Sequence, residues 1–153
     1  MTAPNHALTG AVIGLTVTNP ALALPLAFLS HFMCDAIPHY DMPGEDGPKR
    51  FKSKRFVYEF LVVGAGLCLA IVLLLAAARP QHWLVAACCA FLAASPDLFW
   101  VPRFLYARRT NTEPPLNRFL RFHLWLQWKA GPQLLWLELA WFVGFSMILI
   151  KRL

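Results

Sequence analysis

The chain carries little charge for its length. Only 14% of its 153 residues are charged, whereas 58% are hydrophobic, and the mean hydropathy is +0.51. A soluble domain of this size needs more charged residues to cover its surface. The net charge is +6, with the basic residues clustered, and in a membrane protein such clusters report orientation rather than nucleic-acid binding. We therefore expect residues 1–153 to form a single integral membrane domain that contacts lipids and no nucleic acid, with a homo-oligomer left open.

Two sequence patterns of other protein classes are missing. The cysteines Cys68, Cys88 and Cys89 lie in apolar runs without C-x-x-C spacing, and Cys34 lies within a polar motif. We interpret the first three as small core residues rather than disulfide partners or zinc ligands. The N-terminal residues have no basic segment, and the early apolar stretch carries no A-x-A site ahead of a soluble domain. We expect this segment to stay in the mature protein.

Long apolar runs are the main positive signal. A run of about 20 apolar residues is long enough to cross a bilayer as a helix. The second run is interrupted by Ser95-Pro96-Asp97, and the first and third each contain one acid, Glu59 and Glu138. These runs predict three membrane spans, at residues 57–78, 82–105 and 132–150.

The N-terminal apolar region, residues 4–37, predicts a helical hairpin, because Asn19-Pro20 is a turn signal in its middle. The first of its helices is too short to cross fully, which leaves a re-entrant or half-depth hairpin packed against other helices, with one kinked span as the alternative. Residues 116–129 alternate basic and aromatic side chains at helical spacing. They predict an amphipathic helix on the membrane surface, which gives an all-α polytopic bundle with an interfacial helix.

The two basic stretches fix the expected orientation. Residues 38–56 and 106–131 carry most of the Lys and Arg, so the positive-inside rule places both in the cytoplasm. All the histidines except His82, and every acid within the apolar segments, then fall near the cytoplasmic face. Intramembrane carboxylates are costly and mark functional sites by default, and a bound cation would offset their charge.

The densest signal is a His/Asp motif within residues 30–41. His31 and Asp35 are four residues apart and share one helical face. Pro38 ends the helix, so that His39 and Asp41 can turn back toward the same point. Two imidazoles and two carboxylates suit a divalent metal, with zinc first and manganese or iron as alternatives. The competing interpretation is that these residues cap the helix and form an interface.

Further ionisable residues are weaker candidates. Asp97 is expected to complete the metal shell or act as a general base. The competing interpretation is that it only forms a Ser-Pro-Asp turn. His6 joins the site if the hairpin forms. Glu138 and Glu59 belong either to the site or to an ion pair with a basic residue. His123 belongs either to the site or to an exposed face of the surface helix. The predicted ligands are thus His6, His31, Asp35, His39 and Asp97, with Asp41 and Asp97 as catalytic candidates.

Several of these elements resemble one family. Asn5-His6-Ala7-Leu8-Thr9-Gly10, the cluster from His31 to Asp41 and the Ser95-Pro96-Asp97 step together resemble the membrane-bound metal-dependent hydrolases of the YdjM type. The His-Phe-x-x-Asp spacing is also similar to ligand motifs of zinc-dependent phospholipase C and the S1/P1 nucleases. The resemblance covers residues 1–105. It implies a bacterial inner-membrane protein in which His6, His31, Asp35, His39 and Asp97 are the site residues.

Three functions compete at this point. The leading hypothesis is metal-dependent hydrolysis of a lipid or another amphiphilic ester or phosphoester at the cytoplasmic leaflet. A metal or ion transporter is the second, although transporters place their sites near the bilayer midplane and need polar groups along a path. The third is a non-enzymatic scaffold whose metal only ties helices together.

Overall fold

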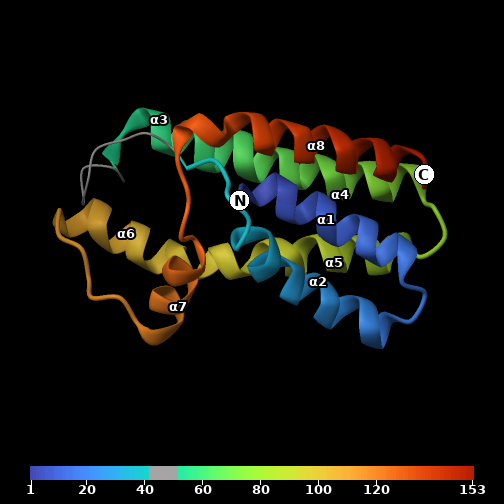
Figure 1. The fold of residues 1–153 in the computed structure, drawn as a ribbon, viewed down its shortest axis with the longest axis horizontal. Coiled ribbons are helices and arrows are strands. Elements are labelled where there is room, and N and C mark those ends of the chain that lie inside the picture. The colour runs from blue at the N-terminus through green and yellow to red at the C-terminus, as the bar shows by residue number, and fades with distance from the viewer. Residues whose placement is uncertain (42–51) are drawn as a thin grey trace.

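The computed structural model describes residues 1–41 and 52–153, and in these residues the chain is helical with no strand. Figure 1 shows the helices packed side by side, with the N-terminus near the middle of the molecule and the C-terminus at one end. The predicted all-α class is confirmed. Of the first basic stretch, Lys49 and Arg50 lie outside the described residues.

Three helical stretches are long and apolar enough to cross a membrane, and they confirm the three predicted runs. The second is longer than predicted and extends to Thr110 instead of residue 105, because its polar end stays helical. The first stretch, Lys54–Ala78, consists of α3 (Lys54–Val57), π-helical η2 (Tyr58–Ala65) and α4 (Gly66–Ala78). The second, Trp83–Thr110, consists of α5 (Trp83–Ala94), 3₁₀-helical η3 (Ser95–Trp100) and α6 (Val101–Thr110). The third, Pro132–Ile150, consists of η4 (Pro132–Leu134) and α8 (Leu135–Ile150).

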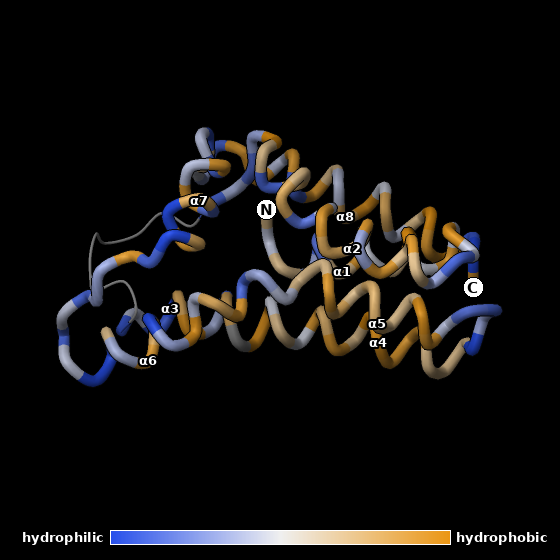
Figure 2. Tube along the Cα trace, turned by 90° about the horizontal axis from the view of Figure 1, so that it is seen from below, coloured by the Kyte–Doolittle hydropathy of each residue, from blue (hydrophilic) through white to orange (hydrophobic). Residues whose placement is uncertain are grey.

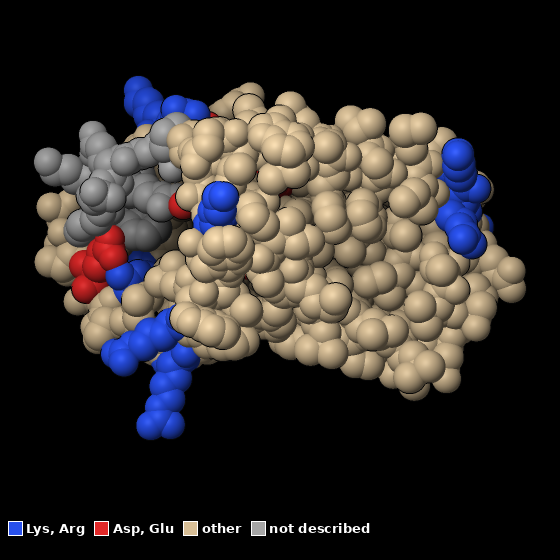
Figure 3. Space-filling model, viewed as in Figure 1, with Lys and Arg blue, Asp and Glu red and all other residues tan. Residues whose placement is uncertain are grey.

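The surface of these helices fits an apolar solvent. Many large hydrophobic side chains of α4, α5 and α8 are exposed, such as Leu69, Leu84 and Leu139 at 57–60%. Figure 2 shows long apolar stretches along the helices, with polar segments gathered near their ends. On the face drawn in Figure 3, the Lys and Arg side chains lie toward the two ends of the molecule and leave a broad uncharged area between them. The chain thus has the surface of a membrane protein.

The N-terminal region forms two short antiparallel helices, α1 (Ala3–Thr16) and α2 (Pro20–Asp35). Asn19 caps α2 by accepting a 3.0 Å hydrogen bond from the Ala21 amide, and Pro20 takes the first position, where its missing N–H costs nothing. The helices have 14 and 16 residues. At about 1.5 Å per residue both are shorter than a bilayer core of about 30 Å.

Helix α1 packs closely on α5 through a Gly-x-x-x-Gly pair. A Cβ atom on Gly10 would overlap the backbone carbonyl of Cys89, and one on Gly14 would overlap the backbone of Ala86. The small residues let the two backbones approach, which is how helices gain contact area where the solvent is as apolar as the side chains. This packing sets the start of α1 beside the end of α5.

The ends of several helices therefore meet at one place. Figure 1 shows the N-terminal end of α1, the C-terminal end of α2 and the start of η3 close together, with α7 (Arg118–Leu126) beside them. Helix α7 is shorter than the predicted 116–129, because Pro114 and Pro115 precede it and the chain leaves the helix at Gln127. Trp128 Nε1 donates to the Ala36 carbonyl at 2.9 Å and ties this end of α7 to α2.

Candidate metal centre

The carboxylate of Asp35 is the centre of a buried cluster. Asp35 ends α2 and is 1% exposed. Its Oδ1 lies 3.1 Å from Nε2 of His6, and its Oδ2 lies 2.6 Å from Nε2 of His123 and 3.2 Å from Nε2 of His31. Gln127 Nε2 also donates to Oδ2 at 3.0 Å. A carboxylate this deeply buried is stable only with such partners around it.

His31 is oriented by a backbone carbonyl just before η3. In a 3₁₀ turn the carbonyl of Ala93 would pair with the N–H of residue 96, but Pro96 has none. His31 Nδ1 instead lies 2.8 Å from the Ala93 oxygen. Since a carbonyl only accepts, Nδ1 carries the hydrogen. This hydrogen bond directs Nε2 toward Asp35, and metal-ligating histidines are oriented by such a bond from their other ring nitrogen.

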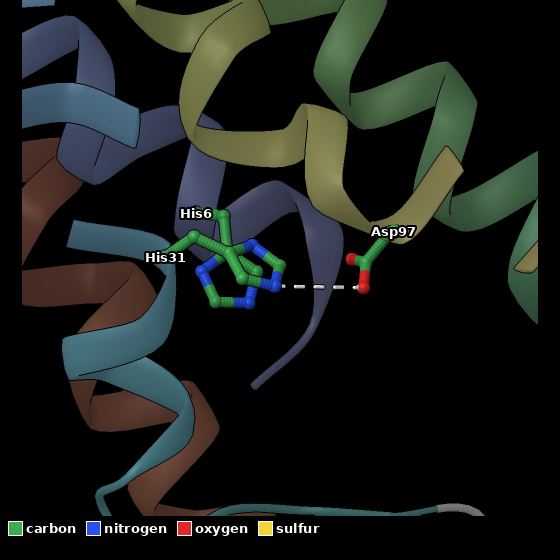
Figure 4. Close-up of side chains that lie close together, drawn as sticks. All are labelled: His6, His31 and Asp97. Carbon is green, nitrogen blue, oxygen red and sulfur yellow. Dashed lines mark ion pairs between the residues drawn. The ribbon is translucent and has the colours of Figure 1, made fainter. Parts of the chain in front are cut away.

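His6 approaches from α1. Its ring stacks on that of His31 with centroids 4.0 Å apart and planes inclined by 27°, and Figure 4 shows both rings together on one side of Asp97. His6 Nε2 also lies 3.1 Å from the Met1 carbonyl oxygen, and the Met1 amino group donates to Asp35. His6 Nδ1 is buried with no hydrogen-bond partner in the described residues. That nitrogen is left available to a ligand.

His123 comes from α7, which Asn117 caps by accepting a 2.8 Å hydrogen bond from the Leu120 amide. The ring is fully buried, whereas neighbours on the same helix such as Phe122 and Trp125 are exposed. His123 Nε2 lies 3.0 Å from His31 Nε2 as well as 2.6 Å from Asp35. Phe122 and Trp125 thus face outward while His123 faces the cluster.

Asp97 stands at the edge of the cluster. It lies in η3, with its Oδ1 3.8 Å from His31 Nε2, and Figure 4 draws this ion pair. Its side chain is 21% exposed, whereas those of His6, His31 and Asp35 are completely buried. Asp97 therefore connects the buried cluster with the space outside it.

Among the described residues, two sets of three side chains can each offer ligand atoms within 4.8 Å of one another: His6, His31 and Asp97, and His31, Asp35 and His123. His31 belongs to both sets, and its Nδ1 is already engaged with Ala93. Three imidazoles with one or two carboxylates are a donor set that suits zinc, manganese or iron. The residues present thus fit a divalent metal.

The structure brings together four of the predicted ligands, His6, His31, Asp35 and Asp97, and places His39 apart from them. The backbone of His39 pairs with the strand-like segment around Ala130, and its Nδ1 lies 2.8 Å from the Ile37 oxygen. Burial lowers the pKa of His39 below its ordinary value. His39 belongs to neither ligand set.

A cavity of about 290 Å³ opens beside the cluster. Asp97 and Gln127 reach it from the cluster side, and the predicted catalytic residue Asp41 is an exposed residue that also lines it. The remaining lining is largely apolar and aromatic, and includes Phe56, Phe60, Trp100, Phe104 and Leu124. The centre therefore has a route to an apolar binding space.

Glu138 has a separate role. It is 4% exposed, and its carboxylate accepts hydrogen bonds from the Thr2 hydroxyl at 2.8 Å and from the Asn5 amide. Neither ligand set of the described residues contains it. Glu138 of α8 instead hydrogen-bonds to Thr2 and Asn5 at the start of α1 and so holds this end of α1, which carries His6, against α8.

Sequence reasoning missed Gln127 and left His123 open between the site and an exposed face. Their basic and aromatic neighbours predict a surface helix. The available signal was the spacing of these two residues, because residues four apart share one helical face. Comparison of the chain with protein-family models, with curated proteins and with solved structures found no match.

Proposed function

We propose that this protein is a metal-dependent membrane hydrolase that acts on a lipid or another amphiphilic ester at the cytoplasmic leaflet. The observation that carries the proposal is the convergence of His6, His31 and His123 on Asp35, beside a cavity that Asp97 lines. A cluster that only held helices together would need no such cavity. The earlier resemblance to membrane-bound hydrolases of the YdjM type agrees with the proposal and stays a prediction.

In this scheme His6, His31, Asp35 and His123 hold the metal. When bound, a divalent ion supplies Lewis-acid chemistry, in that it acidifies water and stabilises developing negative charge. The hydrogen bond from His31 Nδ1 to the Ala93 oxygen directs Nε2 of that ring toward Asp35. The four side chains come from α1, α2 and α7, and the packing of these elements preorganises the centre.

Asp97 is the general base of the proposed reaction. It is the carboxylate that reaches both the cluster and the cavity, since it lies 3.8 Å from His31 and lines the space beside it. From there it accepts a proton from the water that attacks the ester, and returns it to the leaving group. Gln127 lines the same cavity and donates to Asp35, so its amide holds that carboxylate toward the centre.

The membrane-facing surface suggests the substrate class. Exposed apolar side chains cover the long helices, and the aromatic cavity lies where the polar segments begin. An amphiphile in the adjacent leaflet can place its polar bond near Asp97 while its apolar part stays in lipid. The basic residues of α6 and α7, including Arg108, Arg109, Arg118 and Arg121, support a cytoplasmic position of this end.

The test separates metal binding from catalysis. Wild-type protein, Asp35→Asn and Asp97→Asn are purified in detergent, and their metal content and lipid hydrolysis are measured. We expect Asp35→Asn to lose metal and activity, and Asp97→Asn to keep most of the metal while its activity falls by roughly 100-fold or more. Equal metal content in wild type and Asp35→Asn, or no metal in either, would refute the proposal.

A metal site that is only structural is the alternative with an observation in its favour, because four of its five His/Asp side chains are fully buried. The same experiment distinguishes it. Under that alternative, wild-type protein loaded with metal hydrolyses no lipid, although Asp35→Asn still loses the metal.

A further inference from the structure

The cavity beside the metal centre has a wall of aromatic rings. Phe56 and Phe60 stack with centroids 5.6 Å apart and planes inclined by 8°, and Phe104 lies 5.7 Å from Phe56 and 6.4 Å from Phe60. All three line the cavity. The faces of such rings carry negative electrostatic potential and attract cations that lie within about 6 Å of a ring centre.

A carboxylate stands beside this wall. Glu59 precedes Phe60 in the π-helical segment η2, and both residues line the cavity. Its Oε1 accepts a 2.7 Å hydrogen bond from Arg55, whose side chain is 57% exposed, and its Oε2 accepts a longer bond of 3.3 Å from Tyr40. Short π-helical segments within helices are frequent at functional sites. The oxygen nearer Tyr40 keeps capacity for another donor.

The charged side chains that line the cavity have one sign, and the amino group of Met1, which also lines it, is paired with Asp35. Glu59, Asp97 and Asp41 supply carboxylates, and no Lys or Arg is among the described residues that line the cavity. An anionic group next to Glu59 would meet like charge and apolar rings. A positively charged group would meet a carboxylate and ring faces together, which is the usual chemistry of ammonium recognition.

We propose that the cavity binds the ammonium group of a zwitterionic or cationic amphiphile, with Glu59 as the charge partner and Phe60 as the ring partner. The inference rests on the proposed function and narrows its substrate class: the ester lies near Asp97 while the ammonium group lies at the wall formed by η2. The volume of about 290 Å³ is near the lower limit of ligand pockets, about 300 Å³. It is suited to a headgroup, with the acyl chains left in the bilayer.

Binding to metal-free protein tests this without reference to activity. The full chain is treated with a chelator in maltoside micelles, and native mass spectrometry follows the titration of short-chain phosphatidylcholine against phosphatidylglycerol. We expect phosphatidylcholine to bind at least about tenfold more tightly, and Glu59→Gln to lose that preference. Glu113→Gln is the matched control, because Glu113 also pairs with an arginine, Arg103, but does not line this cavity.

Two further measurements keep the outcome decisive. Phe60→Leu preserves an apolar side chain and removes the ring, so it is expected to weaken phosphatidylcholine binding by roughly three- to tenfold even if Glu59→Gln fails to fold. Tetramethylammonium added to wild type identifies the source of the ammonium group. Competition at micromolar concentration indicates a small free compound, which overturns the amphiphile, whereas competition only at millimolar concentration supports it.

The failure of this inference can be told from that of the proposed function. Equal binding of the two lipids by wild type, or an unchanged preference in both Glu59→Gln and Phe60→Leu, would overturn the ammonium site and leave the metal centre standing. The opposite result, a selective cavity in a protein that takes up no metal, would leave the ammonium site and remove the hydrolase.

Discussion

Substitutions of His123 and of His39 distinguish two models of the metal centre, which differ in which of these histidines is a ligand. Sequence spacing favours His39 as a ligand, whereas in the structure His123 Nε2 lies 2.6 Å from Asp35 Oδ2 and His39 belongs to neither ligand set. We expect His123→Gln to weaken zinc binding strongly. We expect His39→Gln to leave it nearly unchanged.

The size of the effect follows from the contacts. Loss of a residue that only orients a metal ligand reduces affinity by about 10–100-fold, so loss of the ligand His123 is expected to cost at least about 100-fold, or about 2.8 kcal/mol. His39 has its ring nitrogen Nδ1 on a backbone oxygen at 2.8 Å. Its replacement is expected to change zinc affinity by roughly twofold or less, as for substitutions away from a site.

The assay is competition with a chromophoric chelator. Metal-free wild type, His123→Gln and His39→Gln in detergent are titrated with zinc, and thermal unfolding of the metal-free samples checks that each variant is folded. If His39→Gln loses as much zinc affinity as His123→Gln, or if His123→Gln binds like wild type, the buried cluster is not the metal centre.

Three further predictions concern the scaffold. Gly14→Ala should lower the free energy of unfolding by about 1–3 kcal/mol, because its Cβ would overlap the α5 backbone. Gly66→Ala is the control and should not lower it, since nothing lies within 4 Å of its Cβ position. Equal thermal midpoints of the two variants would contradict this prediction. Glu138→Leu removes the carboxylate that accepts from the Thr2 hydroxyl and the Asn5 amide, and leaves the Asn5 amide only its bond to the backbone oxygen of residue 138. It should cost about 1–3 kcal/mol by the same measurement, and a wild-type midpoint would contradict that role. Burial lowers the pKa of His39 in the folded state. The unfolded state therefore binds the proton first, and the free energy of unfolding falls as the pH drops below about 6.5. His39→Gln should reduce this loss, which is measured by following the unfolding midpoint as the pH is lowered.

The membrane helices were predictable because each is defined by its own residues. An apolar run of sufficient length needs no partner to be recognised, and the structure has all three. The hairpin was predictable for a similar reason, since Asn19-Pro20 both ends one helix and caps the next. The π-helical register of η2 was not, because no residue in Tyr58–Ala65 announces it.

The site was predictable where its geometry is local. His31 and Asp35 share a helical face by spacing alone, and their ring nitrogen and carboxylate oxygen lie 3.2 Å apart. His123 is 88 residues from Asp35 in the chain, so its contact depends on how α7 docks on α2. The position of His39 likewise depends on its backbone pairing with Ala130. This is a contact between residues far apart in the sequence, which no local pattern predicts.

The same proline that interrupts the second membrane helix also prepares the metal centre. Pro96 has no N–H to offer the Ala93 carbonyl as a 3₁₀ partner. His31 donates to this carbonyl from Nδ1, and the donation directs its other nitrogen toward Asp35. The 3₁₀ turn also carries Asp97 to the edge of the cavity, one residue after the proline. A change of helical register and the orientation of a candidate ligand, which look independent in the sequence, thus meet at the turn around Pro96.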